Sequence, residues 1–273
     1  MEMRDVVTGF YVDVLERLVD KGVVSKSDSV LVVCGGPLDE KVMAMVGFGQ
    51  VTVTNLDDTM SSNFQDAENL TYQNDSFDLV VVHAGLHHCY SPHRALLEMY
   101  RVARKCAVAF EARDSLMIRT AVRFGLTEDY ETHAIRMNNG LGGGVANGPV
   151  PNFIYRWTED EVRKAVASFD PAHAPTVSFF YDLRIPVQRF TQAGNRLMRA
   201  FALAIEPASR LFARLLPKQC NEFAFAVVKA NELQPWMETA VRMRLDKKRG
   251  DRTPNPILSD AEFEKWEENG RIW

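Results

Sequence analysis

The pattern of apolar and polar positions divides the first half of the chain into alternating helices and strands. Apolar residues recur at helical spacing from Val6 to Val19, which predicts an amphipathic helix that ends near Gly22. Short apolar runs that are typical of buried strands follow, with helical stretches between them. The predicted strands are 30–34, 51–54, 77–82 and 106–110, and the predicted helices between them are 40–46 and one that begins at Ser91-Pro92. Strands that alternate with helices favour βαβ units and a parallel sheet.

The pattern becomes less regular after residue 110. Residues 138–147 are rich in glycine and asparagine, which predicts a loop. Thr158-Glu159-Asp160-Glu161 has the spacing of a capping box and predicts a helix that continues to Phe169. Apolar runs at 176–183 and 222–229 predict two more strands.

These elements suggest one large domain with two additions. Residues 187–216 predict a helical cap or insertion, broken at Pro207. The chain is polar after residue 233. We therefore expect a Rossmann-like domain over residues 1–230 and a C-terminal extension over residues 231–273.

The composition is that of an ordinary globular protein and excludes few function classes. Of the 273 residues, 46% are hydrophobic and 25% are charged, and the net charge of -4 argues against a nucleic-acid partner. The 4 cysteines lack the paired spacing of a metal site, so we expect reduced thiols in a cytoplasmic protein. The first residues do not resemble a signal peptide, and no apolar run is long enough to span a bilayer.

The end of the first predicted strand is the best candidate for the start of a ligand site. Val30–Val33 is apolar and is followed by Cys34-Gly35-Gly36. Glycine allows a ligand to approach the backbone closely, and the next helix presents free N–H groups at its first turn. In open α/β sheets, ligands bind beyond the carboxyl ends of such strands.

Residues 30–110 resemble a known family. The motifs that carry the resemblance are Val30–Leu38, Asp66-Ala67-Glu68-Asn69-Leu70, Asn74–Val82, Leu86-His87-His88, and Pro92, Ala95, Leu96, Glu98 and Arg101-Val102. Together they resemble the class I S-adenosylmethionine-dependent methyltransferases, most closely the type 11 methyltransferase domain. The resemblance implies an α/β, Rossmann-like class I methyltransferase fold, mostly parallel with an antiparallel last strand. It also implies S-adenosyl-L-methionine as the cofactor.

The resemblance further implies which residues contact the cofactor. They lie in the glycine turn, after the second strand, at the acid before the strand 77–82, and directly after that strand. The predicted cofactor-binding residues are Cys34, Gly35, Gly36, Asn55, Leu56, Asp57, Asp66, Ala67 and His83.

The chain departs from the family pattern at several of these positions. Val32 replaces an acid, Cys34 and Leu38 replace two glycines, and Asn55 replaces the acid that holds the ribose. The segment 55–66 is also too short for the usual helix. These departures motivate an alternative, in which the chain is a non-catalytic methyltransferase-like binding or scaffold protein.

Three histidines are the predicted catalytic residues. Methyl transfer is an in-line displacement that needs alignment of the reactants, and a general base helps when the acceptor is a hydroxyl. His83, His87 and His88 follow the strand 77–82, with His83 nearest the methyl group. The alternative for His87 and His88 is a structural role in a turn. Cys89 and His93 add potential metal ligands, but their spacing matches no closed site, so we predict no metal.

The segment after the glycine-rich loop is a candidate acceptor wall. Aromatic residues beside a loop suit stacking on a ring or a sugar, and their alternative role is to fill the core. The predicted substrate residues are Asn152, Tyr155 and Arg156. We expect a small-molecule acceptor that is methylated on oxygen, such as a sugar, a glycan or a natural-product hydroxyl. The Arg- and Phe-rich residues 187–216 motivate a further alternative, a membrane-associated enzyme that modifies a lipid-linked glycan.

Overall fold

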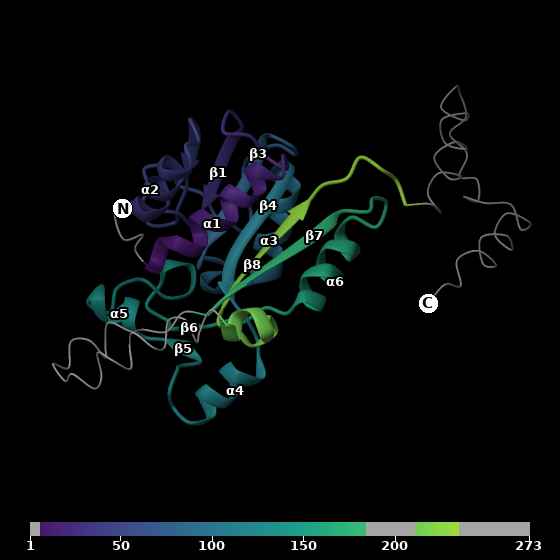
Figure 1. The fold of residues 1–273 in the computed structure, drawn as a ribbon. Coiled ribbons are helices and arrows are strands. Elements are labelled where there is room, and N and C mark those ends of the chain that lie inside the picture. The colour runs from purple at the N-terminus through teal and green to yellow at the C-terminus, as the bar shows by residue number, and fades with distance from the viewer. Residues whose placement is uncertain (1–5, 184–210, 235–273) are drawn as a thin grey trace, which may run out of the picture.

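The computed structural model describes residues 6–183 and 211–234 (Figure 1). Most of the predicted helical cap at 187–216 and of the C-terminal extension lies outside the described residues. The helices are α1 (Val6–Asp20), α2 (Pro37–Val46), α3 (Pro92–Val102), α4 (Leu116–Arg123), α5 (His133–Met137) and α6 (Glu159–Phe169), with short 3₁₀ turns η1 (Leu86–His88), η2 (Val145–Asn147) and η3 (Pro217–Gln219). The strands are β1 (Ser29–Val33), β2 (Gln50–Val53), β3 (Phe77–His83), β4 (Ala103–Ala112), β5 (Tyr130–Glu131), β6 (Asn152–Phe153), β7 (Thr176–Asp182) and β8 (Glu222–Val228).

A mostly parallel sheet forms the centre of the described part of the chain. Its 6 strands have the order β2-β1-β3-β4-β8-β7. The first four strands are parallel, and β8 runs antiparallel to both of its neighbours. The expected parallel sheet with an antiparallel last strand is therefore confirmed.

Helices cover both faces of this sheet, which explains why its strands are continuously apolar (Figure 1). Side chains alternate between the faces along β1. Val30 and Val32 pack with residues of α1 and α2, whereas Leu31 and Val33 pack with residues of α3. Since both sets are excluded from water, each position along the strand favours an apolar residue.

Local sequence signals set the starts of α3 and α6 as predicted. The Ser91 hydroxyl accepts a hydrogen bond from the backbone of Arg94, with Pro92 in the first turn of α3. Thr158 and Glu161 form the predicted capping box at the start of α6. Helix α2 begins earlier than predicted, because Asp39 caps its first turn through the backbone N–H of Gly36.

An insertion between β4 and α6 lies at the carboxyl end of the parallel strands. Arg113 and Trp157 form a bridge, so the chain leaves the sheet and returns to it at one place. The intervening residues form α4, α5 and the small β5-β6 sheet, which Figure 1 shows grouped beside the end of the main sheet. The sequence predicted a loop in this region but not these short elements.

The connection after β2 has no helix, as the short segment 55–66 led us to expect. Residues 54–76 contain neither a helix nor a strand, apart from an isolated bridge between Asn55 and Phe64. Among the described residues, none of the helices combines the length and the apolar character that crossing a bilayer requires.

Candidate active site

The turn after β1 is tightly packed against the neighbouring strands. Cys34 has a φ of 54°, in the left-handed region, and the backbone N–H of Gly35 donates to the carbonyl of Thr54 at 2.9 Å. A Cβ atom on Gly35 would lie 2.6 Å from Cγ1 of Val32 and 2.8 Å from Cγ1 of Val53. Only glycine fits at that position without displacing β1 and β2.

Asn55 joins this turn to the loop after β2. Its Nδ2 donates to the carbonyl of Gly35 at 2.8 Å, and its Oδ1 accepts from the backbone of Asp57 at 3.0 Å. Asn55 therefore uses both ends of its side-chain amide to hold the backbone. Leu56 between them is half-buried. Asp57 accepts two hydrogen bonds from Thr59, both at Oδ1.

A buried acid lies under the turn and connects it to β3. Asp39 accepts hydrogen bonds from Gly36 at 2.9 Å and from the hydroxyl of Tyr11 at 3.1 Å. Burial raises the pKa of Asp39, against the opposing effect of the Gly36 hydrogen bond. The ring of Tyr11 stacks on that of His83, with centroids 4.8 Å apart and planes 5° apart. His83 is thus half-buried at the end of β3, close to the turn.

His87 forms a buried pair with Glu111, the charged residue near the end of β4. The two side chains meet at 2.7 Å through Nδ1 of His87, and the other carboxylate oxygen of Glu111 accepts the backbone N–H of Leu86 at 2.8 Å. The Glu111 side chain has no exposed surface. Burial disfavours the imidazolium, but the charges and hydrogen bonds of Glu111 and Glu131 outweigh it and raise the pKa of His87 to about 10.

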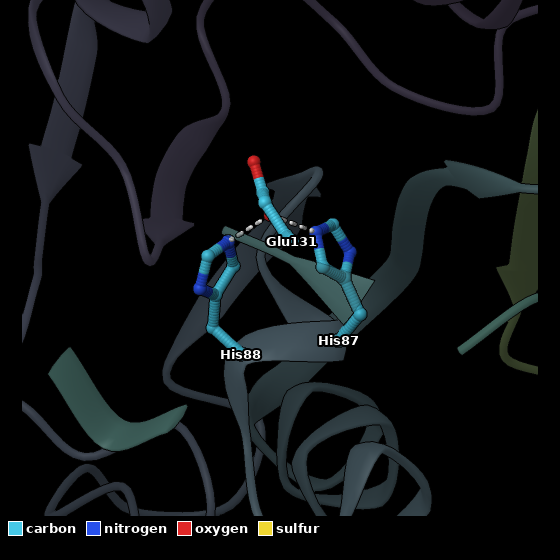
Figure 2. A group of neighbouring side chains, drawn as sticks. All are labelled: His87, His88 and Glu131. Carbon is cyan, nitrogen blue, oxygen red and sulfur yellow. Dashed lines mark ion pairs between the residues drawn. The ribbon is translucent and has the colours of Figure 1, made fainter. Parts of the chain in front are cut away.

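Glu131 of β5 lies opposite both histidines of η1. Figure 2 shows the three side chains pointing toward one another, with both rings directed at one carboxylate oxygen. The distances to Oε2 of Glu131 are 3.5 Å from Nε2 of His87 and 3.4 Å from Nε2 of His88. Asn152 of β6, which is fully buried, also donates to this oxygen at 3.3 Å. The hydrogen bonds from His87 and His88 hold the pKa of Glu131 well below its usual range.

Asp66 and Ala67, two of the predicted cofactor-binding residues, lie before β3 in the turn 66–69. Asp66 is exposed and accepts a hydrogen bond from the backbone of Glu68 at 2.8 Å, within its own turn. Ala67 is buried in the core on the α3 side of the sheet. The carboxylate of Glu68 accepts the N–H groups of Tyr90 and Ser91 at 2.8 and 3.0 Å, which attaches this turn to the segment after η1.

Of the three predicted substrate residues, the structure brings Asn152 to the histidines. The ring of Tyr155 packs edge-on against that of Trp157, with centroids 5.1 Å apart. The guanidinium of Arg156 donates to Asp129 at 2.7 Å within the insertion. These two side chains thus support the structure of the insertion, and a substrate role for any of the three residues stays a prediction.

Sequence reasoning did not single out the two carboxylates of this site. Glu111 had a usable signal, since a charged residue that directly follows the apolar run 106–110 is unusual in a buried strand. Glu131 had none, because it lies in a short strand far from the histidines along the chain.

The sheet order, parallel with one antiparallel strand, and the helices on both faces are those of a Rossmann-like class I methyltransferase fold. Residues 32–110 match the model of a family described as a methyltransferase domain, which confirms the resemblance over this part of the chain. This match identifies residues 32–110 as a methyltransferase domain, and the cofactor that the resemblance implies is S-adenosylmethionine.

Several solved structures are similar to this chain at low sequence identity. The YcgJ protein of Bacillus subtilis is 12% identical, with a TM-score of 0.49, over 81% of this chain and 98% of that one. A putative methyltransferase from Haloferax volcanii, in complex with the Trm112 methyltransferase activator, is 14% identical, with a TM-score of 0.45, over 83% and 99%. Magnesium protoporphyrin IX methyltransferase from Synechocystis PCC 6803, with bound SAH, is 12% identical, with a TM-score of 0.46, over 81% and 82%. No curated protein sequence matches the chain.

The residues at the strand ends fit the cofactor in their chemistry. The close packing of Gly35 leaves backbone, rather than a side chain, at the end of β1. Among the described residues, Oδ2 of Asp57 accepts no hydrogen bond, so a ribose hydroxyl could donate to it. The individual contacts of the cofactor stay predictions.

Proposed function

We propose that this methyltransferase acts on a small molecule and methylates a hydroxyl oxygen, as in a sugar, a glycan or a natural product. The observation that supports an oxygen acceptor is the group formed by His87, His88 and Glu131 beside the Cys34–Gly36 turn. A base is needed when the nucleophile must lose a proton, and imidazole is the side chain best suited to accept it near neutral pH.

The cofactor would be held by the turn and by the loop after β2. Cys34, Gly35 and Gly36 would approach it through their backbone, and Asp57 would accept hydrogen bonds from the ribose. Asp66 and Ala67 would border the adenine, and His83 would lie near the reacting end. When bound, S-adenosylmethionine supplies a methyl group on a positively charged sulfur.

The two histidines of η1 have different parts in this proposal. The carboxylates beside His87 hold its pKa at about 10, so this ring keeps its proton at neutral pH and is a poor base. The ring of His88 is more exposed, at 28% of its side chain, and lies 3.4 Å from Glu131. We therefore assign proton acceptance to His88, with Glu131 stabilising the imidazolium that results.

The proposal is tested in two steps with the purified full chain. Calorimetry with S-adenosylmethionine first measures cofactor binding, and no binding at millimolar concentration would favour the scaffold alternative. Incubation with cofactor labelled with carbon-13 on the methyl group, and with sets of hydroxylated, amine and thiol acceptors, then identifies the methylated atom by NMR. We expect an O-methyl resonance, and products confined to nitrogen, sulfur or carbon would refute the oxygen assignment.

A matched pair of variants tests the base. His88→Ala should lower kcat at least 10-fold and leave cofactor affinity unchanged, because general bases typically contribute 10²–10⁴-fold. His173→Ala is the control, since His173 also pairs with a carboxylate, Asp170 at 2.7 Å, but takes no part in the cluster. Full turnover by His88→Ala would exclude this residue as the base.

A further inference from the structure

The cluster of His87, His88 and Glu131 has a geometry that the proton-transfer role does not require. Three potential ligand atoms, one from each side chain, lie within 4.8 Å of one another. Two of the separations, from the imidazole Nε2 atoms to Oε2 of Glu131, are 3.5 and 3.4 Å. A tetrahedral zinc ion with bonds of about 2.0–2.1 Å has ligand atoms roughly 3.4 Å apart, so these two separations match it, while the third pair lies within 4.8 Å. We infer that His87, His88 and Glu131 form a binding site for a divalent transition-metal ion, with Zn²⁺ as the best fit.

The second nitrogen of each ring has a partner that leaves Nε2 directed at the centre of the cluster. Nδ1 of His87 lies 2.7 Å from Glu111, and Nδ1 of His88 lies 3.4 Å from the carbonyl of Gly144. Both partners are acceptors, so each favours a proton on Nδ1, and Zn²⁺ would displace any proton that Nε2 carries in the metal-free protein. A carboxylate that orients a metal-binding histidine in this way is a recurrent feature of zinc sites.

Buried groups behind Glu131 complete this arrangement. The Nδ2 group of Asn152 fixes Oε2 of Glu131, as Glu111 fixes His87. The Oδ1 atom of the same Asn152 amide is buried and has no hydrogen-bond partner among the described residues. An unpartnered buried acceptor costs about 1–3 kcal/mol, so a donor supplied by a bound water would stabilise this side chain.

The chemistry of the ligands and the local charge identify the ion. Two imidazoles and one carboxylate suit Zn²⁺, whereas Mg²⁺ and Ca²⁺ prefer sites made of oxygen ligands. Glu111 and Glu131 both face His87, so a cation bound between them compensates two carboxylates. Cys89 and His93, which the sequence also offered as ligands, lie outside this set: Cys89 donates to the carbonyl of Gly85 at 3.7 Å, and the ring of His93 packs against Trp157.

Three protein ligands leave a fourth position on the ion. An open position is typical of catalytic zinc sites, where a bound water or hydroxyl has a lowered pKa. In this chain the position would take water or the acceptor hydroxyl, and the lowered pKa of the bound hydroxyl would then take the place of proton acceptance by His88, whose Nε2 cannot hold zinc and a proton together. That last assignment rests on the proposed methyl transfer, whereas the ion site itself does not.

The direct test is titration of metal-free, untagged full-length protein with zinc chloride in a calorimeter, without cofactor or acceptor. We expect one ion per chain. Replacement of zinc by Co²⁺ should give the strong visible absorption of a four-coordinate cobalt site. No saturable binding, or a cobalt spectrum of the hydrated ion, would mean that the cluster is an ion-pair network and would overturn the inference.

Variants locate the ion. His88→Ala and Glu131→Gln should each weaken zinc binding at least 10-fold, and Glu111→Gln should weaken it about 10–100-fold, as outer-shell partners of zinc ligands do. His173→Ala should leave zinc affinity unchanged. Circular dichroism melts of each variant show whether it is folded, and unchanged zinc affinity in folded His88→Ala and Glu131→Gln would place the ion elsewhere.

The metal and the methyl transfer can fail separately. If protein that binds zinc still transfers methyl groups at full rate in the presence of a chelator, the zinc site and the proposed function both stand. Zinc then takes no part in methyl transfer. Zinc binding without any methyl transfer would support the site and refute the proposed function.

Discussion

Replacement of Glu159 by glutamine should destabilise the fold by about 3 kcal/mol. Nη2 of Arg113 donates to both carboxylate oxygens of Glu159, at 3.0 and 2.7 Å. The hydroxyl of Tyr181 donates to the same carboxylate at 2.6 Å. The side chains of Arg113 and Glu159 are 7% and 9% exposed. This buried pair fixes the place where the insertion leaves the sheet and returns to it.

The magnitude follows from the pKa of Glu159. Burial favours the neutral acid, but the hydrogen bonds from Arg113 and Tyr181 outweigh it and lower the pKa from 4.5 to about 2. A shift of this size corresponds to about 3 kcal/mol in favour of the ionised carboxylate in the folded state. Glutamine keeps the shape but removes the charge, which leaves the Arg113 guanidinium buried without its counter-ion.

The same shift predicts the pH dependence. Because the folded pKa lies below the unfolded one, the stabilisation is complete above about pH 4.5 and is lost as the pH falls toward 2. Between pH 7 and about pH 3.5 the natural protein should lose about 1.4 kcal/mol through this group, and the variant should lose none of it. The stability difference between them should therefore shrink from about 3 to about 2 kcal/mol.

Urea unfolding followed by circular dichroism at both pH values measures these differences. Asp160→Asn is the matched control, because it makes the same change in the same turn of α6. The pair of Asp160 with Arg163 is exposed, at 78% and 56%, so its loss should cost less than about 1 kcal/mol. If Glu159→Gln is no more destabilising than Asp160→Asn, or if its deficit is the same at both pH values, the reasoning is refuted.

Two further predictions concern the backbone around the site. Gly85→Ala places a Cβ atom 2.6 Å from that of Cys34 and should destabilise the protein by about 1–3 kcal/mol. Gly49→Ala is the control and should be nearly neutral, because its Cβ atom would have no other atom within 4 Å. Equal melting temperatures of the two variants would contradict the packing argument. Thr158→Ala removes the cap that accepts from the backbone of Glu161 and should cost about 1 kcal/mol in urea unfolding, a loss that Thr158→Ser should largely avoid. Equal losses from the alanine and serine variants would show that the hydroxyl is not responsible.

The strand and helix order was predictable because its signals are local. The apolar run of β1 and the two glycines after it identify a buried strand and a tight turn without reference to the rest of the chain. Ser91-Pro92 and the Thr158 capping box start helices through contacts within one turn. Such features depend on neighbouring residues only, so the sequence contains them explicitly.

The insertion and its contribution to the site were not predictable in this way. Residues 114–156 have short elements and weak periodicity, and their position depends on the Arg113–Trp157 bridge and on the Arg113–Glu159 ion pair. This arrangement brings Glu131 to the histidines. The sequence offered the histidines as bases and weighed a metal, but it lacked the carboxylate that gives the cluster its geometry.

The sequence by itself determined a parallel α/β sheet with a tight glycine turn after β1 and histidines at the same edge, because periodicity and turn residues act over a few positions. It also carried the motifs of a methyltransferase domain, concentrated in residues 32–110. The tertiary structure alone decided that Asn55 holds the turn, that Glu111 is buried against His87, and that Glu131 faces His87 and His88. These contacts join segments distant in the chain, and their energies depend on burial and on the distance between charges, which only the folded chain defines.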